Sequence, residues 1–261
     1  MPKGSRLGMA FHQGLGFSAL FLRLPKAEAV FWPGCALLNL DREILEKTLA
    51  VLRRAEPEIE LACGCCGQPT VYLFPKQAEK RQKKLVSLLK KQGVKRIYTA
   101  CPNCTLQLRQ LGGFEVLPVW PVLAEHIRKE DISGADNQFI WHDPCPTRRD
   151  PVQQEAARKL LTLSGCDCCQ PEHTGCSTRC CGNFHMMAAT DPEKSRKMRL
   201  TRLEEFPPEK TILSSCEGCL GAFRGEGRET QHLLELLFGR SCSRSWANRI
   251  KTTLKQTNGT S

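Results

Sequence analysis

Residues 61–69, Leu-Ala-Cys-Gly-Cys-Cys-Gly-Gln-Pro, contain two adjacent cysteines followed by glycine, and residues 180–182, Cys-Cys-Gly, repeat that arrangement. The repeat extends beyond the pair, because a single cysteine precedes each pair and a Cys-x-x-Cys follows it. The two sets are Cys35, Cys65, Cys66, Cys101 and Cys104, and Cys145, Cys180, Cys181, Cys216 and Cys219. The chain therefore carries one five-cysteine pattern twice.

The spacing of the two sets indicates an internal duplication. The last four cysteines of each set are 115 residues from their counterparts, and Cys35 is 110 residues from Cys145. Scattered buried cysteines have no reason to keep this register, whereas thiolates that surround two metal clusters must keep it. We therefore predict two equivalent metal sites, one in each half of the chain.

Both halves show the same order of expected elements. A short apolar run precedes the first cysteine, a basic amphipathic helix follows the cysteine pair, and a second strand-like run leads into the Cys-x-x-Cys. These segments are residues 29–32, 76–92 and 96–100, and residues 138–141, 191–205 and 210–215. The pattern predicts an α/β fold of two similar lobes that arose by duplication, each a small, mostly parallel sheet with flanking helices. In such sheets, sites gather at the carboxyl ends of the strands.

The chain is long enough for two ordinary domains at 261 residues. We assign residues 1–27 to an N-terminal extension, 28–137 to the first cysteine-rich lobe and 138–240 to the second, and 241–261 to a basic C-terminal tail. Glycines interrupt the apolar part of residues 1–24, no small-residue cleavage site follows, and the segment is too short to span a bilayer. We therefore expect no transmembrane segment and a reducing, cytoplasmic location, where cysteines more often bind metals or carry electrons than form bridges.

The formal net charge of +11 is uneven, because the chain after Glu235 holds five basic residues and no acidic one. A basic surface can meet nucleic acid, an anionic membrane face or an acidic protein. No helix-turn-helix, zinc finger or aromatic RNA-binding motif accompanies it, so we expect no nucleic-acid partner. An acidic redox partner fits better, and a solvated, partly disordered tail is the alternative.

The number of cysteines in each set separates the candidate metals. A structural zinc ion is held by four ligands, and each half offers five cysteines in the same order, so zinc would leave one thiolate over. Glycine after each pair allows a tight turn, because it adopts backbone angles closed to other residues. The count therefore favours an iron–sulfur cluster in each half.

The segments around the cysteines resemble those of a known family. They are Trp32-Pro-Gly-Cys35, Cys65-Cys66-Gly-Gln-Pro69, Ala100-Cys-Pro-Asn-Cys104, His142-Asp-Pro-Cys145, Cys180-Cys181-Gly182 and Cys216-Glu-Gly-Cys219. Over about residues 28 to 240, the chain resembles the cysteine-rich CCG-domain proteins typified by the B subunit of heterodisulfide reductase, with relatives in glycerol-3-phosphate, lactate and succinate oxidation complexes.

The resemblance implies a non-cubane four-iron four-sulfur cluster in each lobe. The implied ligands are Cys35, Cys65, Cys66, Cys101 and Cys104 for the first cluster, and Cys145, Cys180, Cys181, Cys216 and Cys219 for the second. It also implies an iron–sulfur oxidoreductase that works with flavin or iron–sulfur partner subunits, reaches a membrane only peripherally through them, and passes electrons to a disulfide or similar acceptor. Neither half lacks a ligand, which favours the disulfide-reductase branch.

Two other functions stay open. One is an electron-relay subunit, without a substrate of its own, in a quinone-linked or organic-acid-oxidising complex. The other is a structural or sensing module that zinc or a cluster stabilises. No catalytic residue can be assigned from the sequence, although His142 could give a proton to a departing thiolate, cap a strand or hydrogen-bond to a cluster sulfur.

Six cysteines lie outside the two sets, and we expect most of them not to be ligands. They are Cys63, Cys166, Cys168, Cys169, Cys176 and Cys242. Cys63 could compete as a ligand, because only 29 residues separate Cys35 from Cys65, against 34 between Cys145 and Cys180. The group between 166 and 176 is either a loop beside the second cluster, a third metal centre or a redox thiol pair. We expect His173 and His185 to have packing or surface roles, and Trp32 and Trp141 to shield the clusters from water.

Overall fold

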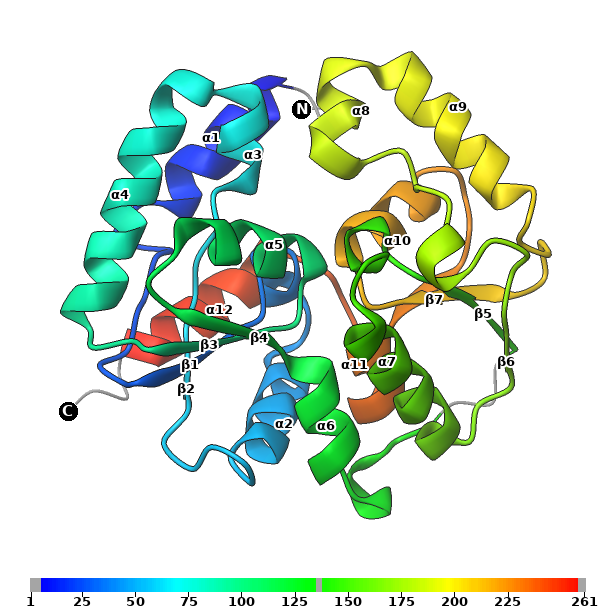
Figure 1. The fold of residues 1–261 in the computed structure, drawn as a ribbon, viewed down its shortest axis with the longest axis horizontal. Helices are drawn as coiled ribbons and strands as arrows, with labels where there is room; N and C mark the ends of the chain where they lie inside the picture. The colour runs from blue at the N-terminus through cyan, green and yellow to red at the C-terminus, as the bar shows by residue number, and fades with distance from the viewer. Residues whose placement is uncertain (1–5, 135–137, 258–261) are drawn as a thin grey trace. The chain divides into compact units, whose positions relative to one another are not determined.

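The computed structural model describes residues 6–134 and 138–257, and the chain divides into two compact units (Figure 1). The first unit comprises residues 1–119 and 241–261, and the second unit comprises residues 120–240. The segment predicted as a separate basic tail is thus grouped with the first unit. The predicted domain boundaries follow the sequence repeat rather than this grouping, and they stay predictions.

Each unit contains one four-stranded parallel sheet with the same strand order. In the first unit the order is β2 (Glu60–Leu61), β1 (Ala29–Trp32), β3 (Arg96–Thr99) and β4 (Glu115–Pro118). In the second unit it is β6 (Cys168–Cys169), β5 (Phe139–His142), β7 (Thr211–Ser214) and β8 (Thr230–His232). All the strand pairs are parallel. The predicted fold class, α/β with two similar lobes, is confirmed.

The pairing of the central strands shows which residues of the two apolar runs correspond to each other. Trp32 is paired with Thr99 in the first unit, and His142 is paired with Ser214 in the second. Thr99 and Ser214 are 115 residues apart, the spacing of the last four cysteine pairs. The structural counterpart of Trp32 is therefore His142, not Trp141, because β5 begins one residue later than the apolar run suggested.

Helices flank both sheets. Those of the first unit are α1 (Arg6–Gly16), α2 (Arg42–Leu52), α3 (Gln68–Leu73), α4 (Pro75–Lys91), α5 (Pro102–Leu111) and α12 (Trp246–Thr257), with the short 3-10 turn η1 (Leu37–Asn39). Those mainly in the second unit are α6 (Val119–His126), α7 (Pro151–Ser164), α8 (Met187–Thr190), α9 (Pro192–Leu203), α10 (Glu217–Arg224) and α11 (Leu233–Phe238). The central strands β1 and β5 are buried along their whole length, as a sheet covered by helices requires.

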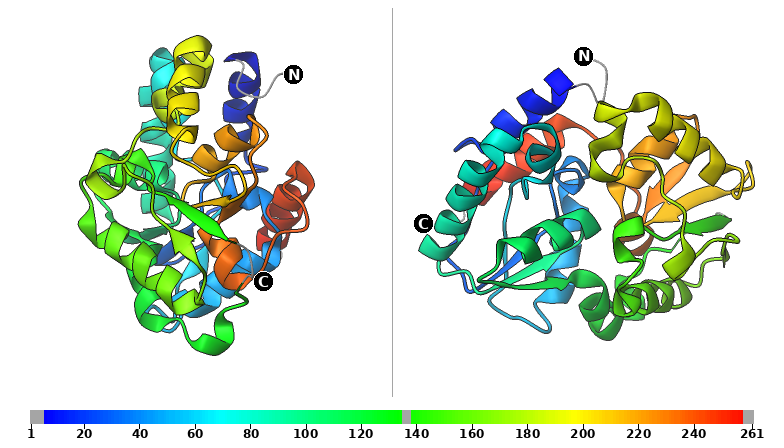
Figure 2. Two further views of the ribbon diagram at one scale, coloured as in Figure 1. Left: turned by 90° about the vertical axis from the view of Figure 1, so that its right-hand side faces the viewer. Right: turned by 45° about the horizontal axis from the view of Figure 1, so that its top comes forward.

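The basic segment after residue 240 is anchored in the first unit. The Asp41 carboxylate accepts hydrogen bonds from the Cys242 backbone N–H at 2.6 Å and from the Asn248 amide at 2.9 Å, and Ser241 Oγ accepts one from the Asp41 backbone N–H. Helix α12 then packs against η1 and α2, and Figure 2 shows it in red beside these blue segments. Residues 246–257 are therefore a packed helix. The last four residues lie outside the described part of the chain.

Two helices of the second unit begin with the same local signal. Asp150 and Asp191 each accept a hydrogen bond from the backbone N–H three residues later, and a proline occupies the first helical position after each. An aspartate cap followed by proline satisfies an otherwise unpaired N–H and presets the helical backbone angle. The sequence alone therefore places the starts of α7 and α9.

Gly182, which follows the second cysteine pair, sits against backbone that cannot move aside. Its φ is +81°, and a Cβ atom built on it would lie 2.1 Å from the carbonyl oxygen of Ser195 in α9. Only glycine therefore fits at this turn, because any side chain would collide with the helix that packs over it.

We expect Gly182→Ala to lower the free energy of unfolding by about 3 kcal/mol, through the left-handed backbone and the collision with Ser195 together. Gly227→Ala is the matched control, because Gly227 has a φ of +80° with no atom within 4 Å of its Cβ position. It should lose only about 1 kcal/mol. Urea unfolding followed by circular dichroism measures both, and equal losses would show that the contact with α9 is not what requires glycine.

Candidate metal centres

The first unit brings its five repeated cysteines together at the carboxyl ends of β1 and β3. Hydrogen bonds link Cys35 with Cys65, Cys65 with Cys66, Cys66 with Cys104, and Cys104 with Cys101. The cysteines therefore form one continuous group of sulfur atoms, although 69 positions separate the first from the last in the sequence.

The second unit repeats this group with the same connections. The Sγ atoms of Cys145 and Cys180 are 3.7 Å apart, and hydrogen bonds link Cys180 with Cys181, Cys181 with Cys219, and Cys219 with Cys216. Each of these links is also present in the first unit, between the two equivalent cysteines. The duplication therefore repeats the links between the sulfurs as well as their order in the sequence.

Glycines bring the backbone close to the sulfurs in both units. A Cβ atom built on Gly34, whose φ is +95°, would lie 2.9 Å from Cys101 Cβ and 3.2 Å from Cys104 Sγ. The Gly67 N–H donates to Cys65 Sγ at 3.5 Å, and the Gly182 N–H donates to Cys180 Sγ at 3.3 Å. These N–H groups stabilise a thiolate at the first cysteine of each pair.

The protonation states support the same conclusion. A hydrogen bond from Cys35, together with one from Cys66, holds the pKa of Cys65 well below its usual value. Hydrogen bonds from Cys145, Cys181 and the Gly182 backbone lower the pKa of Cys180 to about 2. Each group thus already favours a thiolate before any cation binds. A set of thiols that includes a thiolate is a donor set suited to a metal or an iron–sulfur cluster.

Segments outside the repeat contribute polar groups to the first site. Gln13 Nε2 from α1 donates to Cys65 Sγ at 3.3 Å. Arg249 from α12 is fully buried, and its Nη1 lies 3.3 Å from His12 Nε2. The positive charge of Arg249 lowers the pKa of Cys35, a contribution that hydrogen bonding to Cys65 and burial outweigh. Sequence reasoning missed His12, Gln13 and Arg249, because nothing in a terminal extension or a basic tail marks a residue that folds back onto a distant site.

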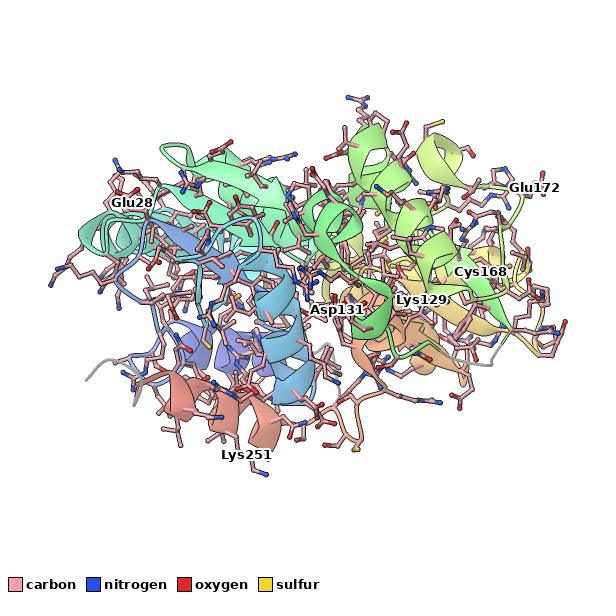
Figure 3. The ribbon with its side chains drawn as sticks, turned by 90° about the horizontal axis from the view of Figure 1, so that it is seen from below. Glu28, Lys129, Asp131, Cys168, Glu172 and Lys251 are labelled. Atoms are coloured by element: carbon pink, nitrogen blue, oxygen red, sulfur yellow. The ribbon has the colours of Figure 1, made fainter. Side chains whose placement is uncertain are left out.

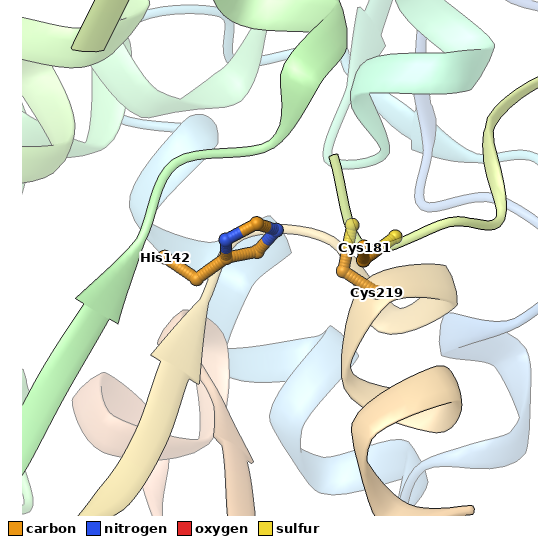
Figure 4. A group of neighbouring side chains, drawn as sticks. All are labelled: His142, Cys181 and Cys219. Carbon is orange, nitrogen blue, oxygen red and sulfur yellow. The ribbon is translucent and has the colours of Figure 1, made fainter. Parts of the chain in front are cut away.

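The second site has a buried histidine and arginine of its own. A ring nitrogen of His142 and the sulfurs of Cys181 and Cys219 all lie within 4.8 Å of one another, and Figure 4 shows the ring beside the two sulfurs. Arg202 Nε donates to His142 Nδ1 at 3.3 Å. Burial, with a smaller contribution from the charge of Arg202, lowers the pKa of His142 to about 3, so the ring is neutral. The sequence had singled out His142 but not Arg202.

Asp143 holds the loop that leads to the second cysteine pair. Its carboxylate accepts hydrogen bonds from Trp141 Nε1, Arg158, Thr174 Oγ1 and the Gly175 N–H, at distances of 2.7 to 3.0 Å. Burial alone would raise the pKa of Asp143, but these hydrogen bonds outweigh it and lower that pKa to about 2. Asp143 is therefore an ionised structural anchor, and the Trp141 N–H is engaged with it.

The two other histidines that the sequence analysis singled out lie outside the sulfur groups. His173 Nδ1 is 3.2 Å from Glu205, and His185 has a left-handed backbone with φ of 55° and a ring centroid 3.9 Å from that of Phe184. His173 therefore lies beside the Glu205 carboxylate, in line with the expected packing role, and His185 lies on a strained turn.

A cavity of about 880 Å³ lies beside the second sulfur group. Its wall includes Cys145 and Cys180 together with the basic residues Arg148, Arg179, Lys194 and Lys197. His185 and Cys176 also line it. The cavity therefore gives a small molecule access to two of the five cysteines, in surroundings that favour negative charge.

The six other cysteines are distributed away from the sulfur groups or at their edges. Cys63 is buried, its thiol hydrogen-bonds to Thr253, and burial raises its pKa to about 11. Cys166 and Cys168 hydrogen-bond to each other, and the bond lowers the pKa of Cys166 to about 6. Figure 3 labels Cys168, the first residue of β6. Cys176 and Cys242 are exposed.

None of the helices in the described ranges, 6–134 and 138–257, combines the length and the apolar character needed to cross a bilayer. All sixteen cysteines lie in these ranges, and all are free thiols.

Comparison with known proteins identifies a family and a relative. A family model described as "CCG: Cysteine-rich domain" matches residues 29–109 and residues 139–224. A component of the dihydromethanophenazine:CoB--CoM heterodisulfide reductase of Methanosarcina mazei is 28% identical over 215 residues, which are 73% of this chain and 52% of that protein. The chain thus spans about half the length of this relative.

Solved structures give a weaker likeness. The aspartate racemase of Picrophilus torridus matches with a TM-score of 0.36 and 12% identity, over 86% of this chain and 93% of that one. The glutamate racemase of Campylobacter jejuni subsp. jejuni matches with a TM-score of 0.36 and 14% identity, over 88% of this chain and 84% of that one. Scores this low relate neither the fold nor the activity of these enzymes to this chain.

The thiol chemistry of the extra cysteines can be checked by alkylation. In anaerobic protein at pH 7, iodoacetamide should modify Cys166 at least about tenfold faster than Cys63, because only the thiolate reacts and Cys63 stays protonated and buried. Cys168→Ala should raise the pKa of Cys166 and slow its alkylation at pH 7. Peptide mass spectrometry at successive times measures the rates. A Cys166 rate that climbs steeply between pH 8 and 9 in the unaltered protein would contradict the lowered pKa.

Proposed function

Because the chain belongs to the CCG cysteine-rich domain family, we propose that it is an iron–sulfur oxidoreductase subunit that passes electrons to a disulfide or similar acceptor. The observation that supports this most directly is the shared order of hydrogen-bonded sulfurs in the two units. Five buried or half-buried sulfurs in each group exceed what a structural zinc ion needs, and they suit a cluster with several irons.

The proposed ligands are the ten repeated cysteines, which would hold one non-cubane four-iron four-sulfur cluster in each unit. Bound clusters of this kind exchange single electrons. The chain's own groups would keep water away and offset the negative charge of the sulfurs. In the first unit these groups are Gln13, Arg249 and the Gly67 N–H, and in the second they are Arg202 and the Gly182 N–H.

The cavity beside the second sulfur group supports an anionic acceptor. Basic side chains line it, and two of the proposed ligands, Cys145 and Cys180, reach its wall. An anionic disulfide would be drawn in by these charges and would place its sulfur–sulfur bond near the cluster. We therefore assign the acceptor site to the second unit.

The proposed setting is a larger assembly. The relative from Methanosarcina mazei is named as a subunit of a heterodisulfide reductase, and it is about twice as long as the matched region. Electrons would come from a partner subunit with a flavin or iron–sulfur centre, and the exposed Lys251 and Lys255 of α12 would favour an acidic partner surface. Sixteen free thiols suit a reducing cytoplasmic location, with any membrane contact made through partners.

The cluster content provides the first test. Anaerobically purified protein should contain roughly eight irons and roughly eight sulfides per chain, and Cys181→Ser or Cys66→Ser should each reduce both to roughly four. Cys242→Ser is the control, because Cys242 is exposed and belongs to neither set, and it should keep the full content. Two zinc ions without sulfide would instead identify a zinc-stabilised module and overturn the proposal.

The acceptor site provides the second test. Adding an anionic disulfide to the reduced protein should generate a new paramagnetic signal, which a simple relay would not give. In the double variant Lys194→Glu, Lys197→Glu, the disulfide concentration that gives half of the maximal signal should be about tenfold higher, because the variant reverses two charges of the cavity wall. Lys83→Glu, on the exposed face of α4, should leave this concentration unchanged. An unaltered spectrum in the wild-type protein would favour the relay.

A further inference from the structure

We propose that His142 is a fixed hydrogen-bond donor to the cluster of the second unit, and that the buried Arg202 is the positioning residue that holds its ring in the donating form. The inference rests on the proposed function, since it concerns the sulfur group to which the cluster would bind. It assigns His142 neither to metal ligation nor to proton transfer.

Arg202 is buried and is held by contacts of its Nε and Nη1 atoms and of its guanidinium face. Its side chain has no exposed surface, its Nη1 donates to Glu205 Oε2 at 2.7 Å and to the His173 carbonyl oxygen at 2.8 Å, and its guanidinium lies 4.5 Å from the centroid of the Phe206 ring. An arginine with these contacts cannot turn away from its neighbour. The hydrogen bond from Arg202 Nε to His142 Nδ1 is therefore a permanent part of the site.

The direction of this hydrogen bond determines the tautomer of the imidazole, that is, which ring nitrogen carries the hydrogen. A guanidinium group only donates, so His142 Nδ1 must accept. A neutral imidazole carries one hydrogen, which must then be on Nε2. Ligation of a metal through Nε2 would require both nitrogens to lack hydrogen, an imidazolate, so the bond from Arg202 argues against a ligand role.

The Nε2–H group needs a hydrogen-bond acceptor. His142 is fully buried, and Nε2 has no hydrogen-bond partner among the residues that the structure describes. A buried N–H without a partner is costly, and such groups are rare in folded proteins. The sulfurs of Cys181 and Cys219 lie within 4.8 Å of the ring (Figure 4). A thiolate ligand or an inorganic sulfide at this place is the acceptor that completes the site.

The duplication gives independent support. The register places Trp32 of the first unit at the position of His142. Trp32 packs in one hydrophobic cluster with Cys65, Cys66 and Cys104, and its Nε1 is also buried without a partner in the described part of the chain. The indole N–H can only donate. Two different aromatic side chains at one strand position thus both offer a buried ring nitrogen that has no partner among the described residues.

A donor at this position has a functional consequence. Hydrogen bonds to cluster sulfurs withdraw negative charge and raise the reduction potential of the cluster. His142 therefore makes the second cluster easier to reduce than it would be without the bond. This suits a site that collects electrons next to the cavity where the acceptor would bind.

Two variants of His142 separate donation from packing. His142→Asn keeps an oxygen where Nδ1 accepts from Arg202 but has no donor at the Nε2 position, whereas His142→Gln can restore an N–H there. A redox titration of the loaded protein, followed by paramagnetic resonance, measures the midpoint potential of each cluster. We expect His142→Asn to make reduction of the second cluster about tenfold less favourable, which is about 59 mV for one electron. In His142→Gln, the midpoint potential of the second cluster should return most of the way to the wild-type value.

The first cluster is the internal control, and its potential should stay unchanged in both variants. Equal potentials in the wild-type protein and His142→Asn would overturn the proposal, and so would a loss that His142→Gln does not recover. Unchanged circular dichroism spectra show that the variants fold.

A measurement without the cluster separates this inference from the proposed function. In the ¹⁵N-labelled chain stripped of iron, long-range proton–nitrogen correlations should show the His142 hydrogen on Nε2 at pH 7. Arg202→Met should release the ring and allow the Nδ1–H form to appear. A wild-type hydrogen on Nδ1 would overturn the positioning role even if iron analysis supports the clusters. If the purified protein contained no iron but the hydrogen were on Nε2, the result would contradict both the proposed function and the hydrogen bond to a cluster. The positioning role of Arg202 would still be supported.

Discussion

The rest of the structure depends on keeping ten sulfurs in two crowded, mostly buried groups. Neighbouring thiolates repel one another, and burying their charge without compensation is costly. Each unit offsets that charge with a backbone N–H from the glycine after the cysteine pair, and with an arginine buried nearby. Gly67 and Gly182 and the strand–helix turns around them follow from this requirement, since only an unobstructed backbone can approach the sulfurs closely.

The two units meet the requirement by different routes. In the first, the cationic and amide groups come from α1 and α12, at opposite ends of the chain, through Gln13 and Arg249. In the second, they come from within the repeat, through Arg202 of α9 and the histidine at the end of β5. The sulfur arrangement is therefore duplicated but its surroundings are not, and two clusters in these surroundings would differ in potential.

The repeated pattern predicted the fold class, and the structure confirmed it in detail. Central strands at residues 29–32 and 96–99, and helix starts after Asp150 and Asp191, follow from local signals in apolar runs, prolines and caps. The apolar run alone pointed to Trp141 as the end of β5, whereas the distance to the first cysteine already favoured His142, because Trp32 and His142 each lie three residues before it. Only pairing with β7 fixes which of them faces the sulfurs.

The sequence by itself determined which ten cysteines group together, because a fixed spacing over more than a hundred residues leaves few alternatives. Tertiary structure alone decided what surrounds them. His12, Gln13, Arg202 and Arg249 carry no local signal, since a polar residue on a helix has the same sequence appearance whether it faces solvent or a buried thiolate. Their roles arise from packing between segments far apart in the chain, as in the contact between Arg249 and His12, which are 237 residues apart.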